Sequence, residues 1–247
     1  MNIKPTAYGN LCSIFYDITK AYAPEREINF YASFMQKDAN HRILEAMSGS
    51  GRLLIPLMQR GYIIDGVDNS TIMLDRCRER CAQLNLTPEL YTQSITELNL
   101  LHKYATVTIA VGSFQLITDK AIALQALKSI RAHMRDNGNL LIDIFIPDMT
   151  RPTPSTRTAQ INNHTIIRLT TRDEFHEEKK RADAFCTYEL IEYGIVQKKE
   201  QELIQVTWYT DTEFTGLLKQ AGFNVVKIYE ENLRPGGPSR IVHAKAV

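Results

Sequence analysis

The stretch that decides the fold is Ile43-Leu44-Glu45-Ala46-Met47-Ser48-Gly49-Ser50-Gly51-Arg52. It is a short apolar run that ends in a glycine-rich turn, and apolar residues at one-face helical spacing, Leu53, Leu54, Leu57 and Met58, follow it. Glycine lets the backbone approach a ligand, and the first turn of a helix offers unpaired N–H groups. A strand, a Gly-x-Gly turn and a helix in this order are therefore typical of a nucleotide-binding turn.

Strands and helices are predicted to alternate on both sides of this turn. The strand pattern covers residues 42–45, 62–68, 89–92, 106–111 and 139–146, and helices are expected over 71–84 and 121–134, with Asn137-Gly138 as the stop of the second. This alternation indicates an α/β fold, a doubly wound, mostly parallel sheet with helices on both faces.

The pattern changes after residue 147. Residues 151–158 are rich in Pro, Ser and Thr and are expected to form a loop, and three strand-like stretches near 165–171, 185–193 and 202–209 follow without a helix between them. A helix with Asp211 as N-cap and two strands, 224–230 and 240–246, then return to the sheet. We therefore predict an N-terminal helical cap (1–40), a core (41–147 and 211–247) and an antiparallel β insertion (148–210), which forms a substrate lobe or an oligomer contact.

Composition narrows the class of partner and the compartment. The 247 residues carry a net charge of +1, which argues against a strongly basic nucleic-acid binder or a polybasic membrane binder. The four cysteines suit neither a disulfide framework nor a metal site, although Cys77 and Cys81 are spaced to share one helix face. No apolar run approaches a membrane span, and the start lacks an apolar signal segment. We expect a reduced, cytoplasmic, soluble protein with no metal.

Asp68 is the second part of the predicted ligand site, beside the glycine turn. It closes the next predicted strand, where a carboxylate can accept hydrogen bonds from both hydroxyls of a ribose. A NAD-type turn would add a third glycine, but Leu54 stands there. Glu45 is unfavourable beside a pyrophosphate and favourable beside a cation. This combination favours S-adenosylmethionine, which has a sulfonium and an ammonium group, while an ordinary turn with incidental glycines stays open.

Several stretches in order resemble class I S-adenosylmethionine-dependent methyltransferases. They are residues 45–52, Gly61-Tyr62, residues 66–70, Met73-Leu74, residues 112–116, residues 137–143 and residues 221–223. The N-terminal Tyr16-Asp17 and Phe30-Tyr31 resemble the cap of the small-molecule branch, near glycine and amino-sugar N-methyltransferases. The resemblance covers nearly the whole chain, and it implies a seven-stranded Rossmann-like sheet, S-adenosyl-L-methionine as cofactor and S-adenosyl-L-homocysteine as product.

The resemblance also implies the site. For the cofactor it implies Tyr16, Tyr31, Glu45, Ala46, Met47, Gly49, Gly51, Asp68, Asn69, Met73, Ser94, Ile95 and Ala110, and for the acceptor Tyr22, Phe114 and Gln115. The sequence departs from the family at three positions. Met47 replaces a usual glycine, Ser94 replaces an acidic residue common near the adenine, and Ala105 replaces an Asp that often opens the fourth strand. Core packing is the alternative role for the three tyrosines.

Methyl transfer is an in-line displacement, so alignment of the reactants carries most of the rate. An amine nucleophile needs only to be neutral, whereas a hydroxyl needs a base. Gln115 stands where amino-sugar relatives can have a histidine, so we assign no catalytic base. Gln115 either orients the substrate or is a structural amide. His164 and His176, in or near the insertion, are the histidines to test as bases.

The predicted function is methyl transfer to a small-molecule acceptor, with N-methylation slightly favoured over O-methylation. Residues 112–115 lack the Asp/Asn-Pro-Pro-aromatic pattern of amino-methylating nucleic-acid enzymes, and no Pro-Cys nucleophile is present, which argues against nucleic acid. We expect no membrane partner and a monomer or homodimer. The alternatives are a NAD-type oxidoreductase and a cofactor-binding protein without catalysis. The acceptor itself stays open.

Overall fold

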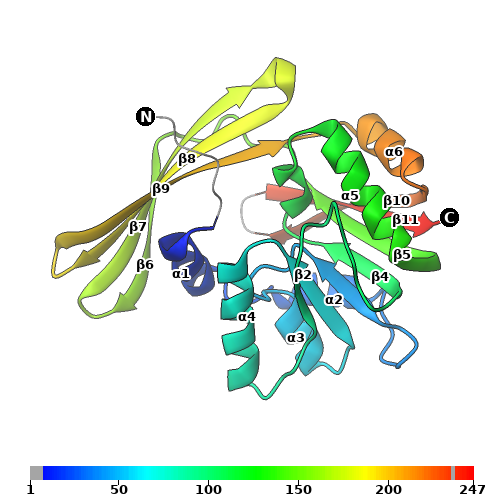
Figure 1. Ribbon diagram of the computed structural model, residues 1–247. Helices are drawn as coiled ribbons and strands as arrows, with labels where there is room; N and C mark the ends of the chain where they lie inside the picture. The colour runs from blue at the N-terminus through cyan, green and yellow to red at the C-terminus, as the bar shows by residue number, and fades with distance from the viewer. Residues whose placement is uncertain (1–7, 235–236) are drawn as a thin grey trace. The chain divides into compact units, whose positions relative to one another are not determined.

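The computed structural model describes residues 8–234 and 237–247, and the chain divides into two compact units. The larger unit comprises Tyr22–Ile146 and Trp208–Val247, and the smaller comprises Pro147–Thr207 with the chain up to Ala21. Figure 1 colours them along the sequence. Within the described part of the chain, no helix is both long and apolar enough to cross a membrane.

The larger unit is built on a seven-stranded sheet of order β10-β11-β5-β4-β1-β2-β3. Strands β1 to β5 pair in parallel, and β11 is antiparallel to both β10 and β5. Their bounds are β1 Ile43–Ala46, β2 Ile64–Asp68, β3 Leu90–Thr92, β4 Tyr104–Ile109, β5 Met134–Ile144, β10 Phe223–Arg234 and β11 Gly237–Ala246. The prediction of a mostly parallel, doubly wound sheet is confirmed.

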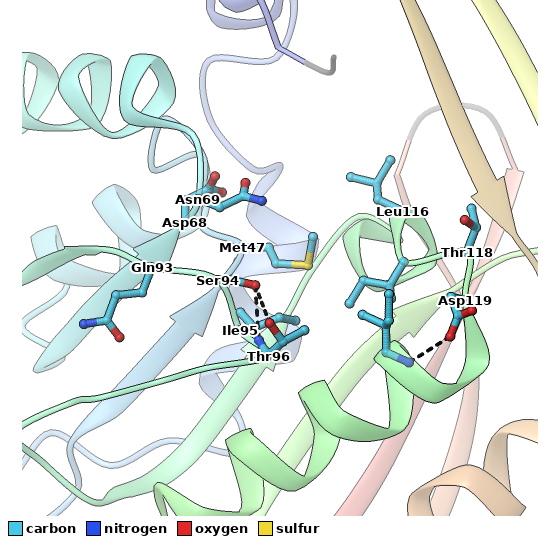
Figure 2. A pocket seen from close by; sticks show the side chains of 12 residues that line it. Met47, Asp68, Asn69, Gln93, Ser94, Ile95, Thr96, Leu116, Thr118 and Asp119 are labelled. Carbon is cyan, nitrogen blue, oxygen red and sulfur yellow. Dashed lines mark hydrogen bonds between the residues drawn. The ribbon is translucent and has the colours of Figure 1, made fainter. Parts of the chain in front are cut away.

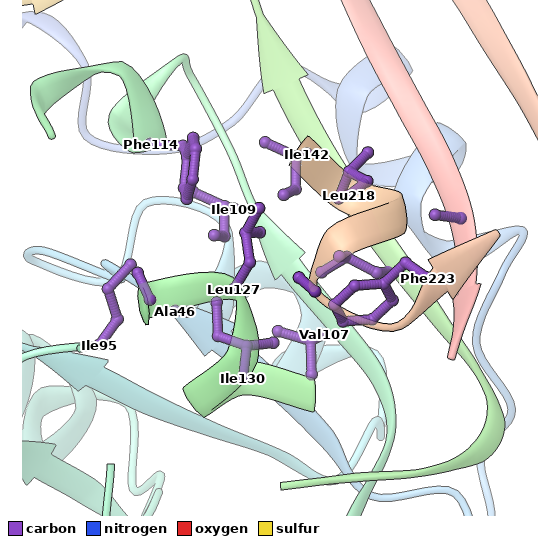
Figure 3. Close-up of a cluster of buried hydrophobic side chains, with 14 of the residues drawn as sticks. Ala46, Ile95, Val107, Ile109, Phe114, Leu127, Ile130, Ile142, Leu218 and Phe223 are labelled. Atoms are coloured by element: carbon purple, nitrogen blue, oxygen red, sulfur yellow. The ribbon is translucent and has the colours of Figure 1, made fainter. Parts of the chain in front are cut away.

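Helices cover both faces of this sheet. They are α2 Glu25–Ala32, α3 Leu54–Gln59, α4 Thr71–Gln83, α5 Lys120–Ala132 and α6 Asp211–Gln220, and a 3-10 turn, η1, spans Ser113–Leu116. Side chains of a strand point alternately to opposite faces. Accordingly Leu44 and Ala46 of β1 pack with α5 and α6, while Ile43 packs with α2, α3 and α4. Figure 3 shows the first of these two clusters.

Two predicted helix ends differ from the structure. Helix α5 ends at Ala132 and β5 begins at Met134, so Asn137-Gly138 lies inside the strand. Asn137 has φ 61°, and the pairing of β5 with β4 is irregular there, which is the geometry of a bulge rather than of a helix stop. The N-cap of α6 is Thr210, not Asp211, because Thr210 and Glu213 form a reciprocal capping box.

The smaller unit is a four-stranded antiparallel sheet of order β6-β7-β8-β9. The strands are β6 Ser155–Asn162, β7 Thr165–His176, β8 Arg181–Glu192 and β9 Ile195–Thr207. Strand β6 was missed, because its Ser- and Thr-rich sequence was interpreted as a loop. It is an edge strand with one buried side chain, Ala159, and the other residues face outward at least in part.

The N-terminal segment is divided between the two units. Helix α1, Asn10–Thr19, buries Leu11, Cys12 and Phe15 against the four-stranded sheet. Helix α2 instead packs Ile28 and Tyr31 into the larger unit. The sequence-based division had placed both helices in one cap of residues 1–40. All four cysteines are free and buried, and Cys77 and Cys81 share the inward face of α4.

Candidate active site

The turn between β1 and α3 has backbone geometry that favours glycine. Gly49 and Gly51 have φ values of 54° and 81°, in the left-handed region. A Cβ on Gly51 would lie 2.7 Å from the sulfur of Cys77. Met47 has φ 58° in the same turn, a conformation that non-glycine residues adopt only with strain. The sharp turn brings the backbone N–H of Gly49 towards the end of β2.

Asp68 joins the ends of β1 and β2. Its Oδ2 accepts a hydrogen bond of 2.9 Å from Gly49 N, and its Oδ1 accepts one of 2.8 Å from Ser70 N. Burial raises the pKa of Asp68, and the backbone N–H donors oppose that rise only in part. A carboxylate has about four lone-pair sites, so two bonds leave capacity for further donors. The carboxylate is thus fixed in place and able to accept from a ligand.

A cavity of about 310 Å³ lies beside Asp68 (Figure 2). It is lined by Met47, Asp68, Asn69, Gln93, Ser94, Ile95, Thr96, Leu116, Ile117, Thr118, Asp119 and Ile122. These residues follow the carboxyl ends of β1 to β4 and reach the start of α5. Open α/β sheets bind ligands at this edge. The volume is within the range of small-molecule sites.

The cavity is apolar in the middle, with acidic groups at two ends. Met47, Ile95, Leu116 and Ile122 supply the apolar surface. In Figure 2 Asp68 and Asn69 lie on one side of Met47, and Thr118 and Asp119 lie on the other. Such a cavity fits an elongated ligand with a flat apolar centre and hydrogen-bond donors at its ends.

A second acidic group lies beneath the turn. Glu45 is 4% exposed, its Oε2 has no hydrogen-bond partner among the described residues, and burial raises its pKa to about 8. The nearby Arg52 makes two hydrogen bonds, of 2.8 and 2.6 Å, to Glu27. Tyr31 is buried in the same cluster, and its pKa is raised by burial and by Asp143, Glu27 and Glu45. A cation near Glu45 would favour its ionised form.

Comparison with known proteins identifies this region. Residues 43–138 match the family model described as a methyltransferase domain. Residues 43–138 are thus similar to a methyltransferase domain. A protein of Geobacillus sp. (strain WCH70) that is named as a methyltransferase is 28% identical over 127 residues, which are 49% of this chain and 51% of the relative. The chain thus spans about half the length of that relative.

Solved structures share the fold around the methyltransferase domain. An S-adenosylmethionine-dependent methyltransferase from Clostridium acetobutylicum has a TM-score of 0.75 at 16% identity, covering 94% of this chain and 96% of its own. The sugar N-methyltransferase KedS8 from Streptoalloteichus sp. has 0.77 at 15%, covering 100% and 97%. DesVI from Streptomyces venezuelae has 0.77 at 16%, covering 97% and 100%. The resemblance to class I S-adenosylmethionine-dependent methyltransferases is confirmed in domain and fold.

The methyltransferase domain brings five of the predicted cofactor residues together. Met47, Asp68, Asn69, Ser94 and Ile95 line the cavity. Others are outside its lining: these are the two turn glycines and the buried Ala46, Met73 and Ala110. Glu45 and Tyr31 belong to the buried cluster around Arg52 instead.

Two predicted tyrosines, Tyr16 and Tyr22, are not among the residues that line the cavity. Tyr22 is 49% exposed, and the Arg80 guanidinium lies 4.7 Å from its ring centroid. Tyr16 belongs to the smaller unit, where its ring packs edge-on against Tyr8 and Lys20 lies over it. Their assignment to the cofactor and acceptor stays a prediction.

The structure corrects two predicted acceptor residues. Phe114 is fully buried in the core and packs edge-to-face on Phe214, with ring centroids 5.6 Å apart. Gln115 donates from Nε2 to Phe145 O over 2.8 Å and accepts at Oε1 from Phe145 N over 2.7 Å. Its amide therefore ties η1 to the end of β5, as the structural alternative foresaw. Neither side chain lines the cavity.

Sequence reasoning missed the part of the cavity wall that precedes and begins α5. These residues are Leu116, Ile117, Thr118, Asp119 and Ile122, joined by Gln93 and Thr96 from the loop after β3. A signal was present, because Thr118-Asp119 immediately before a helical pattern is typical of an N-cap. The predicted helix started at Ala121 without one.

Polar groups at the amino end of β2 and in the smaller unit have structural partners. Asp65, Glu89 and His102 hold ligand atoms close enough for a metal ion, but Arg42 pairs with both carboxylates. In the smaller unit, His164 stacks on Tyr193 at 4.7 Å between centroids. His176 lies 3.4 Å from Asp183 there.

Proposed function

We propose that this protein transfers the methyl group of S-adenosylmethionine to a nitrogen atom of a small molecule and releases S-adenosylhomocysteine. The observation that carries the proposal is the pair of acidic side chains at the glycine turn, the half-buried Asp68 and the buried Glu45. Asp68 can accept hydrogen bonds from ribose hydroxyls. A cationic group near Glu45 would favour its ionised form, whereas a pyrophosphate would disfavour it.

The residues present fit this cofactor. Asp68 is fixed by Gly49 and Ser70 and can accept the ribose hydroxyls. Ile95 and Leu116 offer apolar surface for the base, and Met47 offers a polarisable one. The raised pKa of Glu45 means that its ionised form lacks a sufficient counter-charge, which an ammonium group nearby would supply.

Bound S-adenosylmethionine supplies an activated methyl on a sulfonium with a neutral leaving group. The chain would hold the cofactor in one orientation, with Asp68 on the ribose, so that alignment with the acceptor lowers the barrier. An amine acceptor needs only to be neutral, whereas a hydroxyl needs a base. Nitrogen is the proposed acceptor atom because a solved structure with the same fold is named as a sugar N-methyltransferase.

The chemistry of the acceptor is inferred from the solved relatives and from the net charge. Solved relatives named as sugar N-methyltransferases share the fold at low identity, and they support a small polar amine. The net charge of +1 gives no attraction to nucleic acid. A cytoplasmic location, which the cysteine usage suggests, and a monomeric or homodimeric state remain predictions.

Thermal unfolding with ligands tests the proposal. At 100-fold excess over its dissociation constant, S-adenosylhomocysteine should add about 2.7 kcal/mol, which raises the midpoint by about 5 to 10 °C. NAD⁺ at the same concentration should give no shift. A shift with NAD⁺ and none with S-adenosylhomocysteine would contradict the proposal. A mass-detected screen of small amines against matched phenols then tests the preference for nitrogen.

A further inference from the structure

The cavity contains a second carboxylate whose ligand has not been assigned. Asp119 is the N-cap of α5, and it lies at the side of the cavity away from Asp68 (Figure 2). These two are the only acidic side chains among the described lining residues. If Asp68 takes the ribose, Asp119 faces the part of the ligand beyond it.

The carboxylate of Asp119 is held in a fixed orientation. Its Oδ1 accepts from Ala121 N over 2.8 Å and from Ile122 N over 3.0 Å. Its Oδ2 has no protein donor in the described part of the chain. Capping thus fixes one oxygen and leaves the other as an acceptor at the cavity wall.

The polar groups on the neighbouring wall are already engaged. The Ser94 hydroxyl lies 2.7 Å from that of Thr96, and the Gln93 amide pairs with the backbone of Asn99. Gln125 of α5 donates to Thr96 O over 3.3 Å, which holds this helix beside the loop that carries Ser94. Asp119 is therefore the strongest acceptor on this part of the cavity.

We propose that Asp119 accepts a hydrogen bond from the exocyclic amine of the adenine and makes the site selective for an adenine cofactor over its deaminated form. This rests on the proposed function. An ionised carboxylate only accepts, so it pairs with the amino group of adenine. The carbonyl oxygen at the same position of hypoxanthine would be repelled. Asp119 would thus supply an acidic partner that Ser94 does not.

Calorimetric titration with S-adenosylhomocysteine and S-inosylhomocysteine tests this selectivity. The wild type should bind the adenine compound about 10- to 100-fold more tightly. Asp119→Asn keeps the helix cap, but its amide presents donors where the carboxylate accepts. The preference should then fall by about tenfold or more. An unchanged preference in folded Asp119→Asn would overturn the inference.

Two further variants separate a loss of selectivity at Asp119 from a general loss of stability. Asp119→Ser, another good N-cap residue, should lose the same selectivity. Asp136→Asn makes the same chemical change at an exposed carboxylate that pairs with Arg131, and it should keep the wild-type preference. A wild type that binds neither compound overturns the proposed function and this inference together. Binding of S-adenosylhomocysteine with no preference over S-inosylhomocysteine overturns only this inference.

Discussion

Asp65 and Asp68 lie three residues apart on β2, Asp65 near the amino end of the strand and Asp68 at its carboxyl end. The two carboxylates differ in their hydrogen-bond donors. Asp65 is 2% exposed and receives two hydrogen bonds from Arg42, of 2.7 and 2.9 Å, and one of 2.9 Å from the hydroxyl of Tyr104. Asp68 receives only backbone N–H donors. A buried carboxylate with its own cation belongs to the fold, whereas one without a cation can serve a ligand.

The difference follows from the positions along the chain. Arg42 precedes β1 and Tyr104 begins β4, so the amino edge brings long side chains around Asp65. The carboxyl edge has the glycine turn instead, which offers backbone groups and open space. Removing the Asp65 carboxylate should therefore lower the stability of the fold, and removing the Asp68 carboxylate should weaken ligand binding.

The largest expected effect is on stability at the amino edge. Asp65→Ala leaves the Tyr104 hydroxyl without its acceptor and leaves Arg42 with Glu89 alone. Loss of one partner of a buried ion pair costs about 3 kcal/mol. Urea unfolding should show this as a lower midpoint. Affinity for S-adenosylhomocysteine should stay within about twofold at temperatures where the variant is folded. A large loss of affinity in the folded variant would remove the contrast between the two edges.

The next effect is on binding at the carboxyl edge. Asp68→Ala removes a charged acceptor of the ribose, and the loss should be about 1.5 to 3 kcal/mol, or about 10- to 100-fold in affinity. Calorimetry with S-adenosylhomocysteine measures it, with Asp65→Ala as the matched control. Wild-type affinity in folded Asp68→Ala would exclude Asp68 from the site.

A smaller effect is expected from Glu45 and pH. Its pKa is raised from 4.5 to about 8 by burial, so the folded state binds this proton more tightly than the unfolded state does. The stabilisation is present below about pH 4.5 and is lost as pH rises towards 8, with a slope of up to about 1.4 kcal/mol per unit. Glu45→Gln should remove this dependence, so that its stability relative to the wild type rises by about 3 kcal/mol from pH 5 to pH 8.

Urea unfolding of both proteins across this range checks the prediction. Asp136→Asn, an exposed change, serves as the control and should leave the wild-type slope unchanged. The same slope in Glu45→Gln as in the wild type would show that another group titrates. Saturating S-adenosylmethionine should also flatten the wild-type dependence, if its ammonium group lies near Glu45.

The sequence was sufficient to predict the β1 turn, the position of Asp68 at the end of a strand and the sheet, because glycine spacing and strand alternation are local patterns. It was insufficient for residues whose role depends on distant partners. Gln115 binds the backbone of Phe145, thirty residues away, and a sequence pattern does not show which way a loop amide points. Strand β6 was missed because edge strands tolerate polar residues. The division of α1 and α2 between units also depends on tertiary packing.

A crystal structure with S-adenosylhomocysteine tests the central claim most directly, because it shows what occupies the cavity beside Asp68. The account predicts both ribose hydroxyls within about 2.7 Å of the Asp68 carboxylate, with the base between Ile95 and Leu116 and its amine towards Asp119. A ligand bound elsewhere, or one in the cavity whose ribose does not contact Asp68, would contradict it.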